Sequence, residues 1–170
     1  ESIFIKYAPY IFGVSSKVFP SDSLLKMYSD TDMRKLLFMP DKYRGNQLTH
    51  PIWAPFVRAN TAVSTPELFL IAAECEARVG NLERAMSLVN KLRDHRIKTN
   101  THVVLTDKDQ VLNFVLEERR RELVFNGFTR LIDLKRLNLD PRFATTVKHV
   151  GETETWVLPP DDARYVLPIP

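Results

Sequence analysis

The sequence has 170 residues, 44% hydrophobic and 26% charged, which is the composition of an ordinary globular protein able to bury one core. Its formal net charge of +3 is small for this length, so the charge does not require nucleic acid or an anionic membrane as a partner. Eleven prolines against five glycines favour helices joined by proline-containing loops over a β architecture rich in glycine turns.

The single cysteine, Cys75, excludes an internal disulfide. Residues 70–73 before it are apolar, so we expect Cys75 to be a small buried side chain and not a reactive thiol. No signal peptide opens the sequence, and no stretch approaches the roughly 20 consecutive apolar residues of a membrane span. Since the chain also starts at Glu1 without a Met, we expect it to be truncated.

Residues 1–64 are predicted to form a loop-rich lead with one short helix. Ser21 or Asp22 can cap that helix, which would run through Tyr28. From residue 41 to residue 65, the prolines at 51 and 55 should prevent regular structure, so this segment is expected to be mostly loop.

The loop of residues 41–57 carries aromatic side chains that could bind a ligand. Trp53 is flanked by prolines and lies outside any helical apolar stripe, so it could face outward with Tyr43 and His50. A flat indole covers the apolar face of a sugar ring with little loss of entropy. These three residues are therefore the candidate ligand-binding residues, and the alternative is that Trp53 anchors the core.

Residues 65–137 are predicted to form a helical core. Ser64 and Glu67 can form a capping box at the start of a helix over residues 65–79. Gly80-Asn81 would end this helix and start another, whose apolar residues recur at helical spacing through Leu92. We expect the two helices to form an antiparallel hairpin.

The hairpin resembles a tetratricopeptide repeat, because small residues at Ala72, Ala73 and Ala77 would let its helices approach closely. One hairpin cannot bury both faces alone. A third helix, opened by a cap at Thr106 and Asp109 and running to residue 126, is the expected third wall, with Asn126-Gly127 as its stop. A shorter helix is predicted over residues 129–137.

The third helix places charged side chains on its apolar side, namely Glu118, Arg119 and Glu122. An uncompensated buried charge is costly, so we expect these three to be paired inside the fold. The opposite side should face solvent; it comprises Asn113, Glu117, Arg120 and Arg121. Acid/base catalysis is the alternative role of the cluster, but no nucleophile, metal-ligand set or phosphate loop lies near it in sequence.

Residues 138–170 are predicted to wrap the helices as extended chain. The β-prone runs 145–150 and 154–158 could pair as a small hairpin around Gly151. Trp156 alternates with Thr155 and Val157 in the second run, so we expect it to pack against the fold.

Side chains that could support catalysis or hold a cofactor are sparse. The four histidines show no metal-ligand spacing; they are His50, His95, His102 and His149. We predict no catalytic residue, no metal and no cofactor.

Several motifs at compatible spacings resemble those of the SusD/RagB family, the surface nutrient-binding lipoproteins of Bacteroidetes-type bacteria. The main one is an ERRxEL helix, a Phe-x-Gly turn, and then an Arg followed by Asp-Leu-Lys-Arg: Glu118, Arg119, Arg120, Glu122, Leu123, Phe125, Gly127, Arg130, Asp133, Leu134, Lys135 and Arg136. The others are the ending Leu158-Pro-Pro with Arg164-Tyr-Val-Leu-Pro-Ile-Pro, the run from Leu70 to Ala77, and Ser23, Tyr28, Asp32 and Arg34 upstream. The resemblance covers most of residues 20–170.

The resemblance implies a mainly α-helical fold, with tetratricopeptide-like hairpins, long loops and a small β hairpin near the carboxy terminus. It implies that residues 1–170 form a single domain, the carboxy-terminal portion of a larger protein. That protein would be a surface-exposed lipoprotein of the outer membrane, held by a lipid anchor outside this chain. It would bind an oligosaccharide, or a peptide, without catalysis and pass it to a TonB-dependent transporter.

Two other functions remain open on the residues alone. One is a tetratricopeptide-type scaffold that binds protein partners, and the other is a glycan-processing enzyme.

Overall fold

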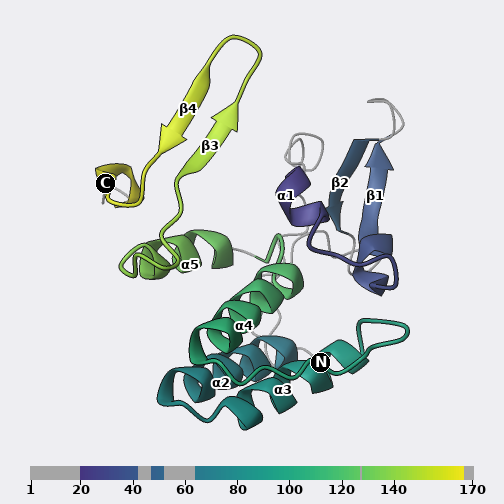
Figure 1. Ribbon diagram of the computed structural model, residues 1–170. Coiled ribbons are helices and arrows are strands. Elements are labelled where there is room, and N and C mark those ends of the chain that lie inside the picture. The colour runs from purple at the N-terminus through teal and green to yellow at the C-terminus, as the bar shows by residue number, and fades with distance from the viewer. Residues whose placement is uncertain (1–19, 42–46, 52–63, 127, 167–170) are drawn as a thin grey trace. The chain divides into compact units, whose positions relative to one another are not determined.

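A computed structural model describes residues 20–41, 47–51, 64–126 and 128–166 (Figure 1). The chain forms two compact units, residues 1–127 and residues 128–170, which are taken in turn. The fold is mainly helical with a small antiparallel hairpin near the carboxy terminus, as the sequence predicts. Among the described helices, none is both long enough and apolar enough to cross a membrane.

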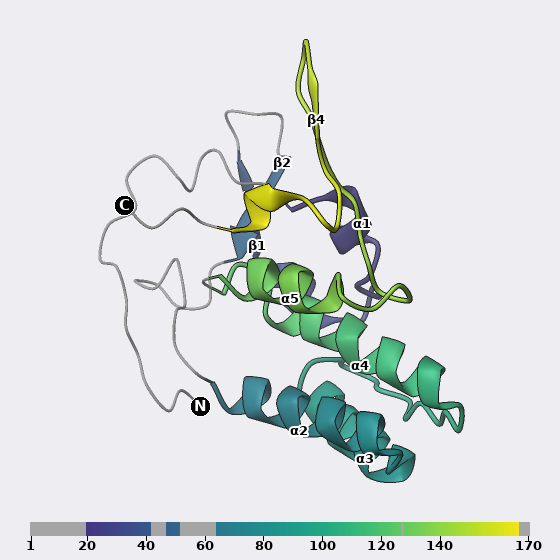
Figure 2. The same ribbon diagram turned by 90° about the vertical axis from the view of Figure 1, so that its left-hand side faces the viewer.

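Three helices form the helical core of the first unit: α2 (Thr65–Val79), α3 (Leu82–Asp94) and α4 (Lys108–Glu122). Each packs against the other two, and they lie side by side in both views (Figures 1 and 2). Ala73, Ala77 and Ala85 have no exposed surface, so α2 and α3 approach closely. The predicted hairpin and its third wall are confirmed.

The caps explain where these helices begin and end. The Oγ of Ser64 accepts a hydrogen bond from the amide of Glu67, as predicted for α2. Gly80 ends α2 with a φ of 94°, a left-handed conformation that costs glycine no Cβ clash. The start of α4 differs from the prediction, because the side chain of Asp107 caps it, accepting from the amide of Gln110 at 2.9 Å.

The carboxy-terminal end of α4 also differs from the prediction, because the helix ends at Glu122 and not at residue 126. Beyond it, Phe125 takes the left-handed conformation with a φ of 55°. Val124 and Phe125 pack against a second apolar cluster that contains Leu24 and Tyr28. This packing draws the chain out of the helix one turn earlier than its local sequence predicts. Gly127 lies outside the described residues.

Cys75 is exposed, so the prediction that it is buried is wrong. The buried face of α2 is set by Leu70, Ala73 and Ala77, which recur three and four residues apart. Cys75 lies two residues after Ala73 and therefore on the opposite side of the helix. The apolar residues before it in sequence are not its neighbours in the core.

The described part of the lead contains more regular structure than predicted. Helix α1 (Asp22–Leu25), capped by Ser21, ends before Tyr28, and a 3-10 helix follows at Met33–Leu37. Strands β1 (Phe38–Asp41) and β2 (Gln47–Pro51) then pair antiparallel. The expectation of loop over residues 47–51 is wrong because a two-stranded sheet consists of edges, where prolines are tolerated.

The second unit begins with α5 (Thr129–Leu137), whose bounds are those predicted. Strands β3 (Val147–Val150) and β4 (Thr155–Leu158) then form the predicted antiparallel hairpin, with Val147 opposite Leu158 and Val150 opposite Thr155. A 3-10 helix follows at Ala163–Tyr165. The side chain of Asn138, just after α5, contacts the chain before and after the β3–β4 hairpin. Its Nδ2 donates to the carbonyl of Pro160, and its Oδ1 accepts from the backbone amide of Thr145.

Candidate functional site

The structure describes little of the ligand site that the sequence predicts. Trp53 and Tyr43 lie outside the described residues. His50 belongs to β2, whose backbone is described but whose side chains are not. His50 is therefore on a strand and not on a loop, and the grouping of these three side chains stays a prediction.

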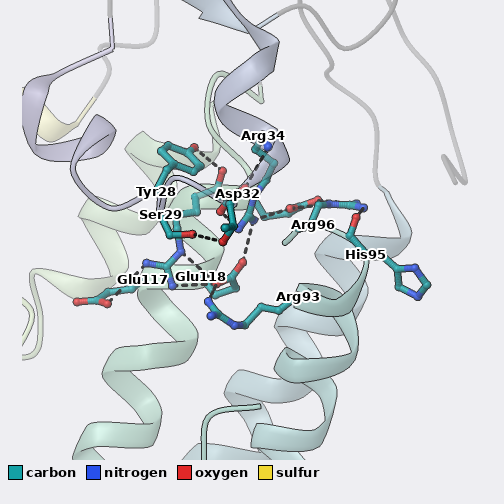
Figure 3. Close-up of polar contacts among 12 residues, drawn as sticks. Tyr28, Ser29, Asp32, Arg34, Arg93, His95, Arg96, Glu117 and Glu118 are labelled. Atoms are coloured by element: carbon teal, nitrogen blue, oxygen red, sulfur yellow. Dashed lines mark hydrogen bonds and ion pairs between the residues drawn. The ribbon is translucent and has the colours of Figure 1, made fainter. Parts of the chain in front are cut away.

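Charged side chains fill the junction of α3, α4 and the segment 28–34 (Figure 3). We call this group the buried charge cluster; it comprises Asp32, Arg34, Arg93, Arg96, Glu118, Arg121 and Glu122. Glu118 has no exposed surface and Glu122 is 5% exposed, although both are carboxylates. Arg119 is 7% exposed, and its Nη2 lies 3.7 Å from Oε1 of Glu67, so the prediction that the inward charges of α4 are paired is confirmed.

Arg34 lies at the centre of the buried charge cluster. Its Nε and Nη2 donate to the carboxylate of Asp32 at 2.9 and 2.7 Å. Its Nη1 lies 2.8 Å from both Oε1 of Glu118 and Oε2 of Glu122. One guanidinium therefore joins the lead to two successive turns of α4.

The second oxygen of each glutamate is held by other arginines. Oε2 of Glu118 accepts from Arg121 at 2.8 Å and from Arg93 at 3.1 Å. Oε1 of Glu122 accepts from Arg96 at 2.9 Å. Because Arg93 and Arg96 come from α3 and the turn after it, the cluster fixes α3 against α4.

Arg121 is 6% exposed, so the prediction that it faces solvent is wrong. Tyr28 covers this side of α4 and donates its hydroxyl proton to the carbonyl of Arg121 at 2.8 Å. The periodicity of a single helix cannot reveal a segment that packs on it from 93 residues away. Asn113 and Glu117, on the same predicted face, are exposed as expected.

The electrostatics keep the cluster charged. Burial alone would raise the pKa of Glu118, but the guanidinium groups of Arg34 and Arg121 hold it below its usual range. Burial would lower the pKa of Arg34, but the hydrogen bonds to Asp32 and the charges of Glu118 and Glu122 raise it. Burial raises the pKa of Tyr28. A carboxylate held ionised among arginines cannot act as a general acid, so the cluster is suited to positioning and not to proton transfer.

A groove of about 800 Å³ runs between α3 and residues 102–106. The side chain of Asn90 fixes this segment to α3. Its Nδ2 donates to the carbonyl of Val103, and its Oδ1 accepts from the backbone amide of Val103. The lining residues that the structure describes include Met86 and Leu105 but no Phe, Trp or Tyr. Within the described residues, the groove therefore offers a sugar no tryptophan, tyrosine or phenylalanine ring to stack on.

Two large aromatic side chains of the described residues are strongly exposed, Phe128 at the start of α5 and Trp156 on β4. Trp156 is 50% exposed, so the prediction that it packs against the fold is wrong. Its ring centroid lies 5.5 Å from that of His149, its partner across the hairpin. Both faces of the hairpin are largely exposed along its length, which is why the burial expected from the alternation of residue types is not found.

Metal binding has no support in the described residues, which bring together no group of three His, Cys, Asp or Glu side chains suited to a metal ion. The described histidines, His95, His102 and His149, are exposed. His102 contacts both carboxylate oxygens of Asp94 at 3.0 Å.

The sequence predicts one part of the buried charge cluster and does not reveal the rest. The inward charges of α4 indicated that partners must exist, but not that Arg93 and Arg96 supply them. The motif that contains Asp32 and Arg34 does not by itself indicate a role in the cluster. The two residues are separated by one position, so the carboxylate of Asp32 can accept from both the backbone amide and the guanidinium of Arg34. This spacing is the sequence feature that could have indicated their pairing.

Comparisons with known proteins agree with this architecture. A sequence model of the SusD family matches residues 65–162. The crystal structure of a SusD superfamily protein from Bacteroides fragilis is similar, with 27% identity, a TM-score of 0.59, and coverage of 85% of this chain and 32% of that chain. A SusD-like carbohydrate binding protein from Bacteroides vulgatus is 18% identical, with a TM-score of 0.61 and coverage of 94% of this chain and 40% of that chain. No curated protein shows significant similarity to the sequence.

Proposed function

Because this chain belongs to the SusD family, we propose that it is part of a nutrient-binding protein that captures an oligosaccharide without transforming it. The family match over residues 65–162 carries this proposal. The chain spans about a third of one structural relative and two fifths of the other. The activity is therefore proposed for the complete gene product, and residues 65–126 supply a rigid part of its scaffold.

The proposal includes a place of action. The protein is a lipoprotein exposed on the outer membrane, anchored through a lipid outside these residues, and it delivers its ligand to a TonB-dependent transporter. An oligosaccharide is the favoured ligand, since the carbohydrate-binding relative shares the fold, and a peptide is the second choice.

The absence of catalysis is supported by the chemistry of the described residues. Glu118 and Glu122, which share Nη1 of Arg34, are buried and each is held by arginines. Neither is available to a sugar in solvent. A hydrolase would instead need two accessible carboxyl groups on either side of the bond to be cleaved.

Trp53, Tyr43 and His50 remain our candidates for part of the ligand surface. Trp53 follows the last residue of β2 by two positions, and β2 is paired with β1 in a small sheet. The paired strand fixes the chain at Pro51, and this supports the choice of the neighbouring residues as candidates.

Calorimetry on the complete gene product tests the function. The titrants are maltoheptaose, xylohexaose, arabinohexaose, a mannan oligomer, a galacturonate oligomer and a tryptic peptide mixture. We expect saturable binding of at least one oligosaccharide, and about a tenfold weaker affinity in Trp53→Ala with an unchanged melting temperature.

Two outcomes would contradict parts of this account. If none of the oligosaccharides binds while the peptide mixture does, the ligand class is wrong. If a sugar binds equally well to Trp53→Ala, or if that variant melts much earlier, Trp53 belongs to the core and not to the ligand surface.

A further inference from the structure

Trp156 lies on the β3–β4 hairpin, where its side chain is not buried in a core. It lies on β4 directly opposite His149 on β3, and half of its surface is exposed. The two rings are inclined by 37° with centroids 5.5 Å apart. Half of the apolar surface of this indole therefore stays in contact with water, which is unfavourable compared with burial.

Gly151 leaves the space that the indole occupies, because glycine has no side chain. A Cβ atom at Gly151 would lie 2.8 Å from Cζ3 and 3.2 Å from Cη2 of Trp156, so the far edge of the ring occupies the space that any other side chain would fill. The turn itself is closed by a hydrogen bond from the amide of Gly151 to the carbonyl of Glu154. The ring is therefore seated on a closed turn, between Gly151 and His149.

A fixed, half-exposed aromatic ring suits a sugar. Its flat face can cover the C–H groups of a pyranose, and little entropy is lost because the ring is already ordered. Glu152 and Glu154, in the turn of the same hairpin, are exposed and can accept hydrogen bonds from hydroxyl groups. Both are negatively charged, so this end of the hairpin repels a uronic acid and is suited to a neutral sugar.

We propose that Trp156, seated on Gly151 and His149, is a stacking site for one neutral sugar ring of the bound oligosaccharide. This inference rests on the proposed function and adds a second aromatic contact, 103 positions after Trp53. It also gives the ligand a chemical class, since oligomers of uronic acids should avoid this site.

The test uses the complete gene product and whichever neutral oligosaccharide of the calorimetric panel binds. Trp156→Ala should weaken its affinity about tenfold. Gly151→Ala keeps the indole but displaces it, so this variant should lose affinity to a similar extent. Val157→Ala is the matched control, because Val157 is the next residue on β4 and projects from the other face of the hairpin.

Oxidation of tryptophan by N-bromosuccinimide, mapped by peptide mass spectrometry, supplies a readout of the site itself. Trp156 should be oxidised in the free protein and protected by the bound oligosaccharide, while galacturonate oligomer leaves it unprotected.

Three other outcomes would overturn the inference. If Trp156 resists oxidation in the free protein, another part of the gene product covers it and the inference is wrong. Binding of a neutral sugar that neither protects Trp156 nor weakens in Trp156→Ala would overturn the inference and leave the proposed function standing. If no oligosaccharide of the panel binds the unaltered protein, the proposed function fails and the stacking site fails with it.

Discussion

At the scale of single residues, the buried charge cluster joins separate segments of the chain through ion pairs. Arg34 is 2% exposed and contacts three carboxylates, which come from the lead and from α4. Breaking a buried pair leaves a charge without compensation, and this costs far more than the pair itself contributes. The cluster therefore specifies how these segments meet, and each member is sensitive to the loss of another.

Glu118→Gln should destabilise the protein by about 3 to 5 kcal/mol, because it leaves Arg34 and Arg121 facing a neutral amide in a buried site. Urea denaturation of the complete gene product, followed by far-UV circular dichroism, measures this change. Glu117→Gln is the matched control. Its side chain is 47% exposed and lies 3.8 Å from Arg121, so it should cost under about 0.5 kcal/mol. Equal urea midpoints for the two variants would show that the cluster does not stabilise the fold.

The pH dependence of this difference follows from the lowered pKa of Glu118. The folded state holds Glu118 ionised, whereas the unfolded state binds a proton near its ordinary pKa of 4.5. The stability that Glu118 contributes is therefore complete above that pH and is lost as the pH falls through the lower pKa of the folded state. The gap in urea midpoint between the unaltered protein and Glu118→Gln should shrink on acidification from pH 7 toward pH 3. A gap that grows on acidification would contradict the assigned direction of the shift.

At the scale of elements, the turn between α2 and α3 depends on one glycine. Gly80 has a φ of 94°, and an added Cβ would meet nothing within 4 Å. Gly80→Ala should therefore cost about 1 kcal/mol through backbone conformation alone, with no clash. Thermal melting measures the loss, and Val79→Ala at a 78% exposed position is the control. If Gly80→Ala melts with the unaltered protein, the left-handed cap is not required there.

Most helices could be predicted from the sequence because their signals are local. The capping serine at 64, the glycine at 80 and the apolar spacing between them set α2 without any knowledge of the rest. Helix α5 and the β3–β4 hairpin were predicted for the same reason. The early end of α4 was not, since Phe125 leaves the helix to pack against a cluster formed by residues almost 100 positions earlier.

Contacts across long sequence separations also explain the errors in side-chain environment. Arg121 lies on the polar side of α4, and Tyr28 packs over that side. Cys75 follows an apolar run but lies on the far side of α2 from Ala73. Trp156 is held by its hairpin and not by a core. The candidate ligand residues Trp53 and Tyr43 remain predictions, since the structure describes neither.

At the scale of the whole molecule, we propose that the described residues form part of the scaffold of a larger binding protein. They span a third to two fifths of the structural relatives and contain a tetratricopeptide-like hairpin with its third helix. The buried charge cluster joins this core to the lead that precedes the predicted ligand loop. We expect ligand binding to depend on that junction, so Glu118→Gln should weaken both stability and affinity.

The central claim is that this protein binds a nutrient glycan and releases it unchanged. Equilibrium dialysis of the complete gene product against the oligosaccharide panel, followed by mass spectrometry of the sugars on both sides, measures binding and cleavage together. We predict that at least one oligosaccharide accumulates on the protein side and is recovered at its original mass after prolonged incubation. Even distribution of every oligosaccharide, or shortened products that are absent without the protein, would contradict the claim.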